Sequence, residues 1–229
     1  ARPEVYAPIN PIDLSRVTRR GGDYAQGELE RIMDTDPVAV AALRQYGRFL
    51  PGARCVVFCV TVEHAQHVAE AFRKAGWAAE CLHGKTPDRD EMVGRLTSGT
   101  TQVLVTIAVV SEGFDLPAVA GAILLRPTLS TGLFQQQTGR ALRTFPGKSR
   151  ALILDLVRNS LLHGLPEADR PWTLAGGVKG LERSAPRTVR CPKCTRVHEA
   201  APRCVGCGPA QLVNRAADDR ALREGVALG

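Results

Sequence analysis

The chain has 229 residues, of which 44% are hydrophobic, and this is enough for one sizeable core and a small second module. Its formal net charge of +7 favours a polyanionic partner, although an excess of this size also occurs in proteins without a nucleic-acid role. No apolar run reaches the length of a membrane span, and the first residues contain no signal-peptide apolar region. We therefore expect a soluble cytoplasmic protein, and the start without methionine suggests part of a longer polypeptide.

A helical pattern covers about residues 23–49. It places Leu29 and Met33 on one apolar face, and Val38, Ala42 and Tyr46 on the next. The pair Pro51-Gly52 then ends the pattern. We expect residues 1–50 to form a helical lead-in to the main domain.

Five short apolar runs follow, each of a length typical of a buried strand. They begin at Arg54, Ala78, Gln102, Gly121 and Ala151. Runs that are apolar on both faces are typical of a parallel sheet covered on both sides.

A helical pattern separates the first two runs. Thr61 is its expected N-cap and Gly76 its expected C-terminal stop, and four residues share its apolar face: Ala65, Val68, Ala69 and Phe72. The repeated βαβ order predicts an open α/β sheet with helices on both faces, which binds ligands at the carboxyl ends of its strands.

The segment S-E-G-F-D-L-P, residues 111–117, lies directly after the third run and so at this carboxyl edge. Gly113 permits an unusual turn, the Asp115 carboxylate can accept a hydrogen bond from a ribose hydroxyl, and Pro117 directs the chain away. These residue types predict a ligand-binding loop.

The segment Q-Q-T-G-R-A-L-R follows the fourth run and is expected to be helical. One face would carry Gln136, Gly139, Arg140 and Arg143, at spacings i, i+3, i+4 and i+7. The packing face would carry Phe134, Thr138, Ala141 and Phe145. Outward guanidinium groups on a rigid helix suit phosphate oxygens. Taken alone, the pattern also fits an ordinary amphipathic helix with a solvated charged side.

The seven cysteines form two groups. Cys55, Cys59 and Cys81 lie in apolar runs, where reduced thiols pack as small hydrophobic groups. The other four form C-P-K-C, a nine-residue spacer and C-V-G-C: Cys191, Cys194, Cys204 and Cys207. Two facing C-x-x-C turns can complete a tetrahedral zinc site with no open position, so we expect a structural Zn²⁺. A thioredoxin-like redox pair is the alternative, but it needs one C-x-x-C beside a βαβ core.

Basic residues surround these cysteines, namely Arg187, Arg190, Lys193, Arg196 and Arg203. They fit two interpretations equally well. One is a solvated basic surface, and the other is a rigid support for nucleic-acid phosphates.

Four segments follow one another along the chain: V-V-F-C-V-T-V-E-H-A, C-L-H-G-K-T-P, V-L-V-T-I-A-V-V-S-E-G-F-D-L-P and Q-Q-T-G-R-A-L-R. In this order they resemble the motifs IV, IVb, V and VI of DEAD/DEAH-type superfamily 2 DNA/RNA helicases of bacteria and phages. The resemblance covers about residues 56–174 and implies a second RecA-like motor domain. In that family ATP with Mg²⁺ lies in a cleft between two such domains, the first of which holds most of the nucleotide.

The resemblance also implies roles for individual residues. Arg143 would be the arginine finger and Arg140 would contact the γ-phosphate, which makes these two the catalytic candidates. Four residues would contribute to ATP binding: Gly113, Asp115, Gln136 and Gly139. Four would contribute to nucleic-acid binding: Ser111, Glu112, His83 and Gly84. The chain departs from motif V at Ile107 and Ala108, where the family has threonine and aspartate.

Two short segments imitate nucleotide-binding motifs. G-K-T at Gly84 lacks the glycine of a P-loop five positions earlier, where Ala79 stands, and Pro87 follows it. The strand that ends near Asp155 is not followed by the acidic pair of a Walker B motif. We therefore expect the chain alone not to hydrolyse ATP.

The predicted fold class is α/β: a RecA-like parallel sheet with helices on both faces, followed by a small zinc-ribbon module. We expect a lead-in from a first motor domain at 1–50, the RecA-like domain at 51–174, a linker at 175–186 that packs partly through Trp172 and Leu174 just before it, and the ribbon with a polar tail at 187–229. The expected function is the C-terminal motor domain of an ATP-dependent helicase or translocase, with DNA favoured over RNA as its track. A non-catalytic zinc-ribbon scaffold that binds nucleic acid or protein is the alternative.

Overall fold

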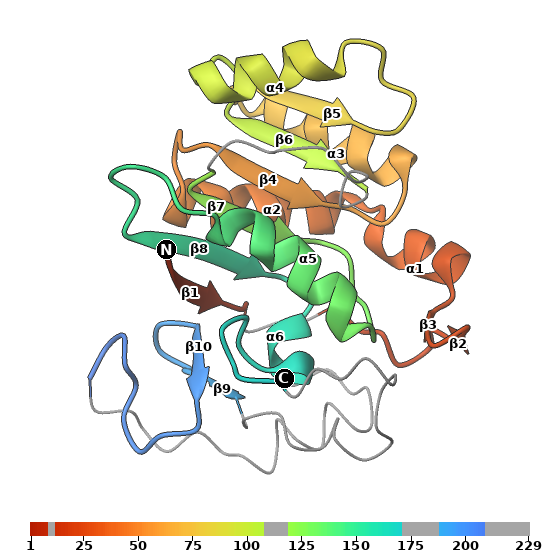
Figure 1. Ribbon diagram of the computed structural model, residues 1–229. Coiled ribbons are helices and arrows are strands. Elements are labelled where there is room, and N and C mark those ends of the chain that lie inside the picture. Colours follow the sequence, from red (N-terminus) through yellow and green to blue (C-terminus); the bar gives the residue numbers. More distant parts are fainter. Residues whose placement is uncertain (9–11, 108–118, 171–187, 209–229) are drawn as a thin grey trace.

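The computed structural model describes residues 1–8, 12–107, 119–170 and 188–208, and an eight-stranded sheet forms its centre (Figure 1). The strand order is β5-β6-β4-β7-β8-β1-β10-β9. The strands are β1 (Arg2–Tyr6), β4 (Cys55–Phe58), β5 (Ala79–Leu82), β6 (Val103–Thr106), β7 (Gly121–Leu124), β8 (Arg150–Asp155), β9 (Thr188–Arg190) and β10 (Arg196–Glu199). Pairing is parallel from β5 to β1 and antiparallel between β1, β10 and β9. A separate hairpin joins β2 (Arg19–Arg20) to β3 (Asp23–Tyr24).

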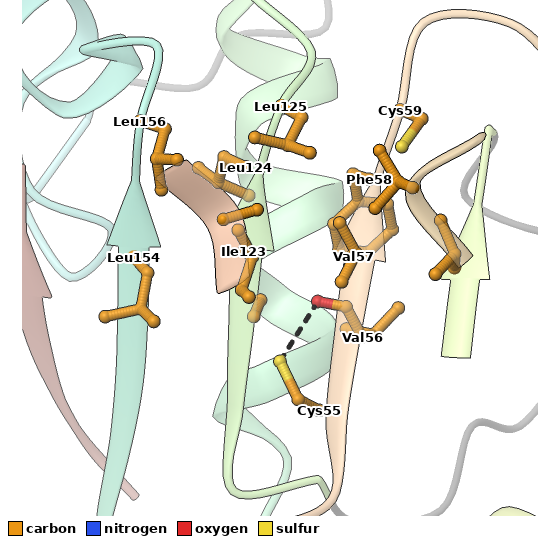
Figure 2. Packing of buried hydrophobic residues seen from close by; sticks show 14 of the residues in the cluster. Cys55, Val56, Val57, Phe58, Cys59, Ile123, Leu124, Leu125, Leu154 and Leu156 are labelled. Atoms are coloured by element: carbon orange, nitrogen blue, oxygen red, sulfur yellow. Dashed lines mark hydrogen bonds between the residues drawn. The ribbon is translucent and has the colours of Figure 1, made fainter. Parts of the chain in front are cut away.

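All five strands predicted from apolar runs are present, as β4 to β8. Every residue of β4, β6 and β7 is buried. Figure 2 shows Val57, Phe58, Ile123 and Leu124 of neighbouring strands packed in this core. Burial on both faces explains why these strands lack the alternation of apolar and polar residues found in a half-exposed sheet.

Six helices accompany the sheet within the described residues: α1 (Gln26–Met33), α2 (Asp36–Phe49), α3 (Val62–Lys74), α4 (Arg89–Ser98), α5 (Thr131–Leu142) and α6 (Asn159–His163). Figure 1 shows α5 on one face of the sheet, with α2 and α3 on the opposite face. The prediction of a RecA-like α/β sheet covered on both faces is confirmed. No helix in the described segments has the length and apolar character needed to cross a bilayer.

The predicted ends of α3 are also confirmed. The Thr61 side chain accepts a hydrogen bond from the His64 N–H at 3.2 Å, as an N-cap does. Gly76 follows the helix with φ of +87°, in the left-handed region that favours glycine. The four residues predicted to face the core, from Ala65 to Phe72, are buried.

The first 50 residues are not only helical, which corrects part of the sequence expectation. Strand β1 pairs along its full length with β8, and Val5 is buried between β8 and β10. Its sequence R-P-E-V-Y mixes proline and charged residues and so carries no strand pattern. The proposed domain boundaries stay predictions; Trp172, Leu174 and the polar tail after residue 208 lie outside the described residues.

Candidate functional sites

Helix α5 carries the segment predicted to bind phosphate. Its packing side is formed by Phe134, Gln137, Thr138 and Ala141, all buried against the sheet. Gln136 is exposed, while Gly139 and Arg140 are half-buried, so the structure keeps these three outside the core.

The end of α5 differs from the prediction in two respects. The helix stops at Leu142, so Arg143 is its exposed C-cap residue with extended backbone rather than a member of the helical face. Phe145 is 49% exposed and lies against the Arg54 guanidinium, 5.6 Å from the ring centroid, instead of packing in the core. The Lys148 ammonium donates to the carbonyls of Ala141 and Arg143, which holds this helix end in place.

A hydrogen-bond network fixes the loop that leads into α5. The Asp23 carboxylate accepts from the Thr128 hydroxyl at 2.6 Å and from the Leu129 N–H at 2.7 Å. The Asn159 side-chain amide donates to the Arg126 carbonyl and accepts from the Thr128 N–H. Sequence reasoning missed Asp23 and Asn159, because no local pattern marks a contact with a residue 105 positions away.

His163 completes this support from α6. Its Nε2 lies 2.8 Å from the Thr128 carbonyl oxygen, and its ring stacks on Phe134 of α5 with centroids 5.3 Å apart. Burial lowers the pKa of His163, which favours a neutral ring whose Nε2–H donates to that carbonyl. Ser130 then caps α5 by accepting from the Leu133 N–H. The start of the helix is therefore held from three directions.

The predicted ribose loop, with Ser111, Glu112, Gly113 and Asp115, lies outside the described residues. The strand that leads to it, β6, ends at the same edge of the sheet as β4 and β7. Here the Arg126 side chain donates to the Ile107 carbonyl at 3.0 Å and so ties β6 to the β7–α5 loop.

The H-G-K-T segment forms a turn after β5. Thr86 donates its N–H to the His83 carbonyl and accepts from the His83 N–H through its hydroxyl. His83 is half-buried and Gly84 is exposed. Helix α4 begins only at Arg89, so the glycine, lysine and threonine do not lead directly into a helix as they do in a P-loop.

Asp155, the imitation of a Walker B residue, has a structural role. It is fully buried and accepts hydrogen bonds from the N–H groups of Asn159 and Ser160 and from the Ser160 hydroxyl. Burial raises the pKa of this carboxyl although these bonds oppose the shift. The carboxyl group thus stabilises the start of α6.

The four predicted metal ligands converge. Their sulfur atoms all lie within 4.8 Å of one another, with Sγ–Sγ distances of 3.6 Å for Cys191 and Cys207 and 3.5 Å for Cys194 and Cys204. A tetrahedral zinc ion with Zn–S bonds of about 2.3 Å keeps its sulfurs about 3.8 Å apart. The donor set and its dimensions therefore fit zinc with no position left for substrate.

Two similar backbone turns present these thiols. In the first, the Thr195 N–H donates to the Cys191 carbonyl; in the second, the Gly208 N–H donates to the Cys204 carbonyl and the Cys204 N–H donates to that of Gly208. The residue that follows each C-x-x-C has positive φ, +64° at Thr195 and +82° at Gly208. Burial raises the pKa of the Cys191 thiol, but N–H groups of the turn outweigh this and lower it to about 7, whereas the hydrogen bond with Cys191 raises the pKa of Cys207 to about 12. Of this pair, Cys191 is the thiol that more readily becomes the thiolate that a metal needs.

The basic residues of the module separate into two kinds. Arg190 is buried and donates to the Pro8 carbonyl, and an Arg196 nitrogen lies 3.8 Å from a Glu4 oxygen, so both connect the module to the start of the chain. Lys193 and Arg203 are exposed, and Arg187 lies outside the described residues. Only part of the predicted basic surface is therefore available to a ligand.

Comparison with known proteins identifies the central part of the chain. Residues 39–145 match the helicase conserved C-terminal domain. This part of the chain is a helicase C-terminal domain of the superfamily 2 type. The matched range includes β4 to β7 and all of α5, together with Arg140 and Arg143.

Three relatives show how far this helicase similarity extends. A 51.5 kDa protein of a Lactococcus phage is 30% identical over 198 residues, which is 84% of this chain and 43% of the relative. The protein irc3 of Schizosaccharomyces pombe, named as a candidate mitochondrial ATP-dependent helicase, is 40% identical over 126 residues, 53% of this chain and 20% of the relative. The UvrABC system protein B of Anaplasma marginale is 26% identical over 185 residues, 76% of this chain and 26% of the relative. The chain spans less than half the length of each.

Proposed function

We propose that this chain supplies one wall of an ATP cleft in an ATP-dependent helicase or translocase that moves on nucleic acid, with DNA as the favoured track. The opposite wall, with the P-loop and the residues that hold Mg²⁺, is contributed by a first RecA-like domain. The support is the helicase C-terminal domain together with an α5 whose arginines lie outside the core while its start is held rigidly.

In this proposal each residue of the α5 segment has a distinct role. The Arg143 guanidinium neutralises charge that develops on the transferring phosphoryl group, and the Arg140 guanidinium binds the γ-phosphate. Gln136 couples the cleft to the track, and Gly139 allows the opposite wall to approach closely. Gly113 and Asp115 contact the ribose side, while Ser111, Glu112, His83 and Gly84 lie along the nucleic acid.

The four-cysteine module has a structural role in the same proposal. Cys191, Cys194, Cys204 and Cys207 hold Zn²⁺, which keeps the two turns together. The similarity to a phage protein agrees with action in the cytoplasm of a bacterial or phage-infected cell.

This 229-residue chain alone should not hydrolyse ATP, because it lacks a P-loop: neither of its G-K-[ST] segments, at Gly84 and Gly147, has the required glycine five positions earlier. The decisive test joins the chain to a first RecA-like domain and measures ATPase activity with and without DNA. Arg143→Ala should lower the stimulated rate roughly 10³-fold or more. Arg44→Ala, which removes an exposed arginine of α2 on the opposite face of the sheet, should leave it unchanged.

Equal rates for the two variants would contradict the arginine-finger assignment and favour a non-catalytic scaffold. Loss of DNA stimulation in Arg143→Ala with unchanged DNA binding would place the defect in the cleft.

A further inference from the structure

The hairpin of β2 and β3 has a basic tip that the proposed cleft does not use. Its turn is Arg20-Gly21-Gly22-Asp23, and both glycines have positive φ, +62° and +85°, as a two-residue hairpin turn of the primed type requires. A Cβ atom at either glycine would meet nothing within 4 Å. The tip therefore stands in open space, where a ligand can approach the backbone closely.

Two carboxylates mount this hairpin rigidly on the domain. Glu28 of α1 accepts from the Thr18 N–H at 2.7 Å and from the Thr18 hydroxyl at 2.8 Å. Asp23 bonds to Thr128 and Leu129, directly before α5. Figure 1 shows the hairpin on the side to which the parallel strands point, close to α1. The basic tip is thus fastened to the loop that leads into α5.

The arginines in and next to the hairpin are placed where they could bind an external ligand. Arg16, Arg19 and Arg20 are exposed, and among the described residues none of them lies in an ion pair or a side-chain hydrogen bond. Their acidic neighbours Asp13, Asp23 and Glu28 accept hydrogen bonds from main-chain N–H groups instead. The carboxylates are used in local structure while the guanidinium groups remain in solvent.

We propose that this hairpin contacts nucleic acid: Arg19 and Arg20 bind backbone phosphates, and Asp23 holds the hairpin in a fixed position relative to the start of α5. Guanidinium groups match phosphate oxygens in geometry and are always charged. The hairpin would thereby extend the track beyond the residues assigned from helicase motifs. This inference rests on the proposed function, since it assumes that the domain moves on nucleic acid.

The test measures binding of the 229-residue chain to fluorescein-labelled single-stranded DNA by anisotropy, over a series of KCl concentrations. Arg19→Ala/Arg20→Ala should weaken binding roughly tenfold and make the slope of log K against log salt shallower by about 1.4, the value for two lost phosphate contacts. The control, Arg44→Ala/Lys74→Ala, removes the same charge from α2 and α3 and should change neither quantity appreciably.

A third variant tests the anchor. Asp23→Ala removes a negative charge, which by electrostatics alone would strengthen binding to DNA. If Asp23 positions the tip, binding should weaken several-fold instead, while the melting temperature of the four-cysteine module, followed by zinc release, stays the same. Unchanged or tighter binding of Asp23→Ala would overturn the anchoring role.

Equal losses in the hairpin and control variants would overturn the inference, because they would reflect net charge alone. Its failure can be told from failure of the proposed function. A hairpin variant that binds like the unsubstituted chain, combined with an inactive Arg143→Ala motor, refutes only the hairpin contact. A motor that is indifferent to Arg143→Ala refutes the cleft whatever the hairpin does.

Discussion

The parallel strands and the strands of the four-cysteine module belong to one continuous sheet, but each of the two regions is stabilised in a different way. Every residue of β4, β6 and β7 is buried and most of them belong to the apolar core, whereas Val197 is the one residue of that cluster from the described part of the module, 188–208. Val205 at the tip of the second turn is 62% exposed. Burial of apolar area can therefore stabilise the first region, whereas the second is predicted to need a metal bound by its four cysteines.

Removing the metal should separate the two regions most strongly. Structural zinc sites contribute apparent binding free energies of about 10–16 kcal/mol in isolated finger peptides, more than the module's few buried side chains can replace. With a chelator at neutral pH, amides of β9 and β10 should lose protection from hydrogen exchange, followed by those of Val5 and Ala7, which contact β10 and its turn. Amides of β4 and β7 should stay protected.

Cys194→Ser should reproduce the effect of the chelator, and Cys81→Ser, a half-buried thiol outside the cluster, should keep the metal. A Cys194→Ser chain with full zinc content and normal protection would contradict the metal site.

Gly121→Ala should have the next largest effect, in the sheet rather than in the module. A Cβ there would collide with the Leu152 carbonyl oxygen and lie 2.9 Å from Leu50 Cδ1. The backbone cannot move aside without disturbing the pairing of β7 with β8. The free energy of unfolding, measured by urea denaturation, should therefore fall by about 3 kcal/mol. Gly94→Ala on the exposed side of α4 is the control, with an expected gain of about 1 kcal/mol. Similar losses in both would refute the close approach.

His64 should make the sheet region sensitive to acid. Burial lowers its pKa to about 4, while Asp34 opposes this shift. Between pH 6.5 and pH 4 the unfolded chain therefore binds a proton at His64 that the folded chain does not bind. The contribution of the neutral His64 to the free energy of unfolding is thus full above pH 6.5 and is lost as pH falls. The loss from pH 7 to pH 5 is on the order of 2 kcal/mol. His64→Gln should remove that slope in urea unfolding followed at each pH.

His67 acts in the opposite sense. Its hydrogen bonds to Asp34 and Asp36 raise its pKa, so its contribution is present at low pH and is lost as pH rises. His67→Gln should therefore steepen the acid loss slightly. For His64, the result that would contradict its role is a free energy of unfolding that falls more steeply with acid in His64→Gln than in the unsubstituted chain.

The smallest expected effect distinguishes the two metal turns. Thr195 is β-branched and has φ of +64°, where Gly208 occupies the equivalent position of the second turn. This conformation costs a branched residue about 1–2 kcal/mol, partly offset in a glycine variant by greater freedom of the unfolded chain. Thr195→Gly should raise the free energy of unfolding of the zinc-loaded module by about 0.5–1 kcal/mol. Gly208→Thr should lower it, and two changes of equal sign would refute this comparison.

Local patterns in the sequence were sufficient for much of the fold and for part of the candidate sites. The strands β4 to β8, the capping of α3 by Thr61 and the convergence of the four cysteines are confirmed. Each depends on residues that are neighbours in sequence or on a spacing that only one geometry satisfies. The roles of Arg140, Arg143 and the loop with Asp115 stay predictions, because in the proposed function they act on a nucleotide held mainly by a first RecA-like domain.

What only the tertiary structure decided are the contacts between distant segments. Strand β1 lies between β8 and β10 because both present unpaired edges to it, although its own residues show no strand pattern. Asp23 reaches the loop before α5 across 105 positions. The helix ends at Leu142, and Lys148 donates to the carbonyls of Ala141 and Arg143 at this end. A sequence shows which groups must be buried or bonded, but the partner of each is selected only when the chain has closed on itself.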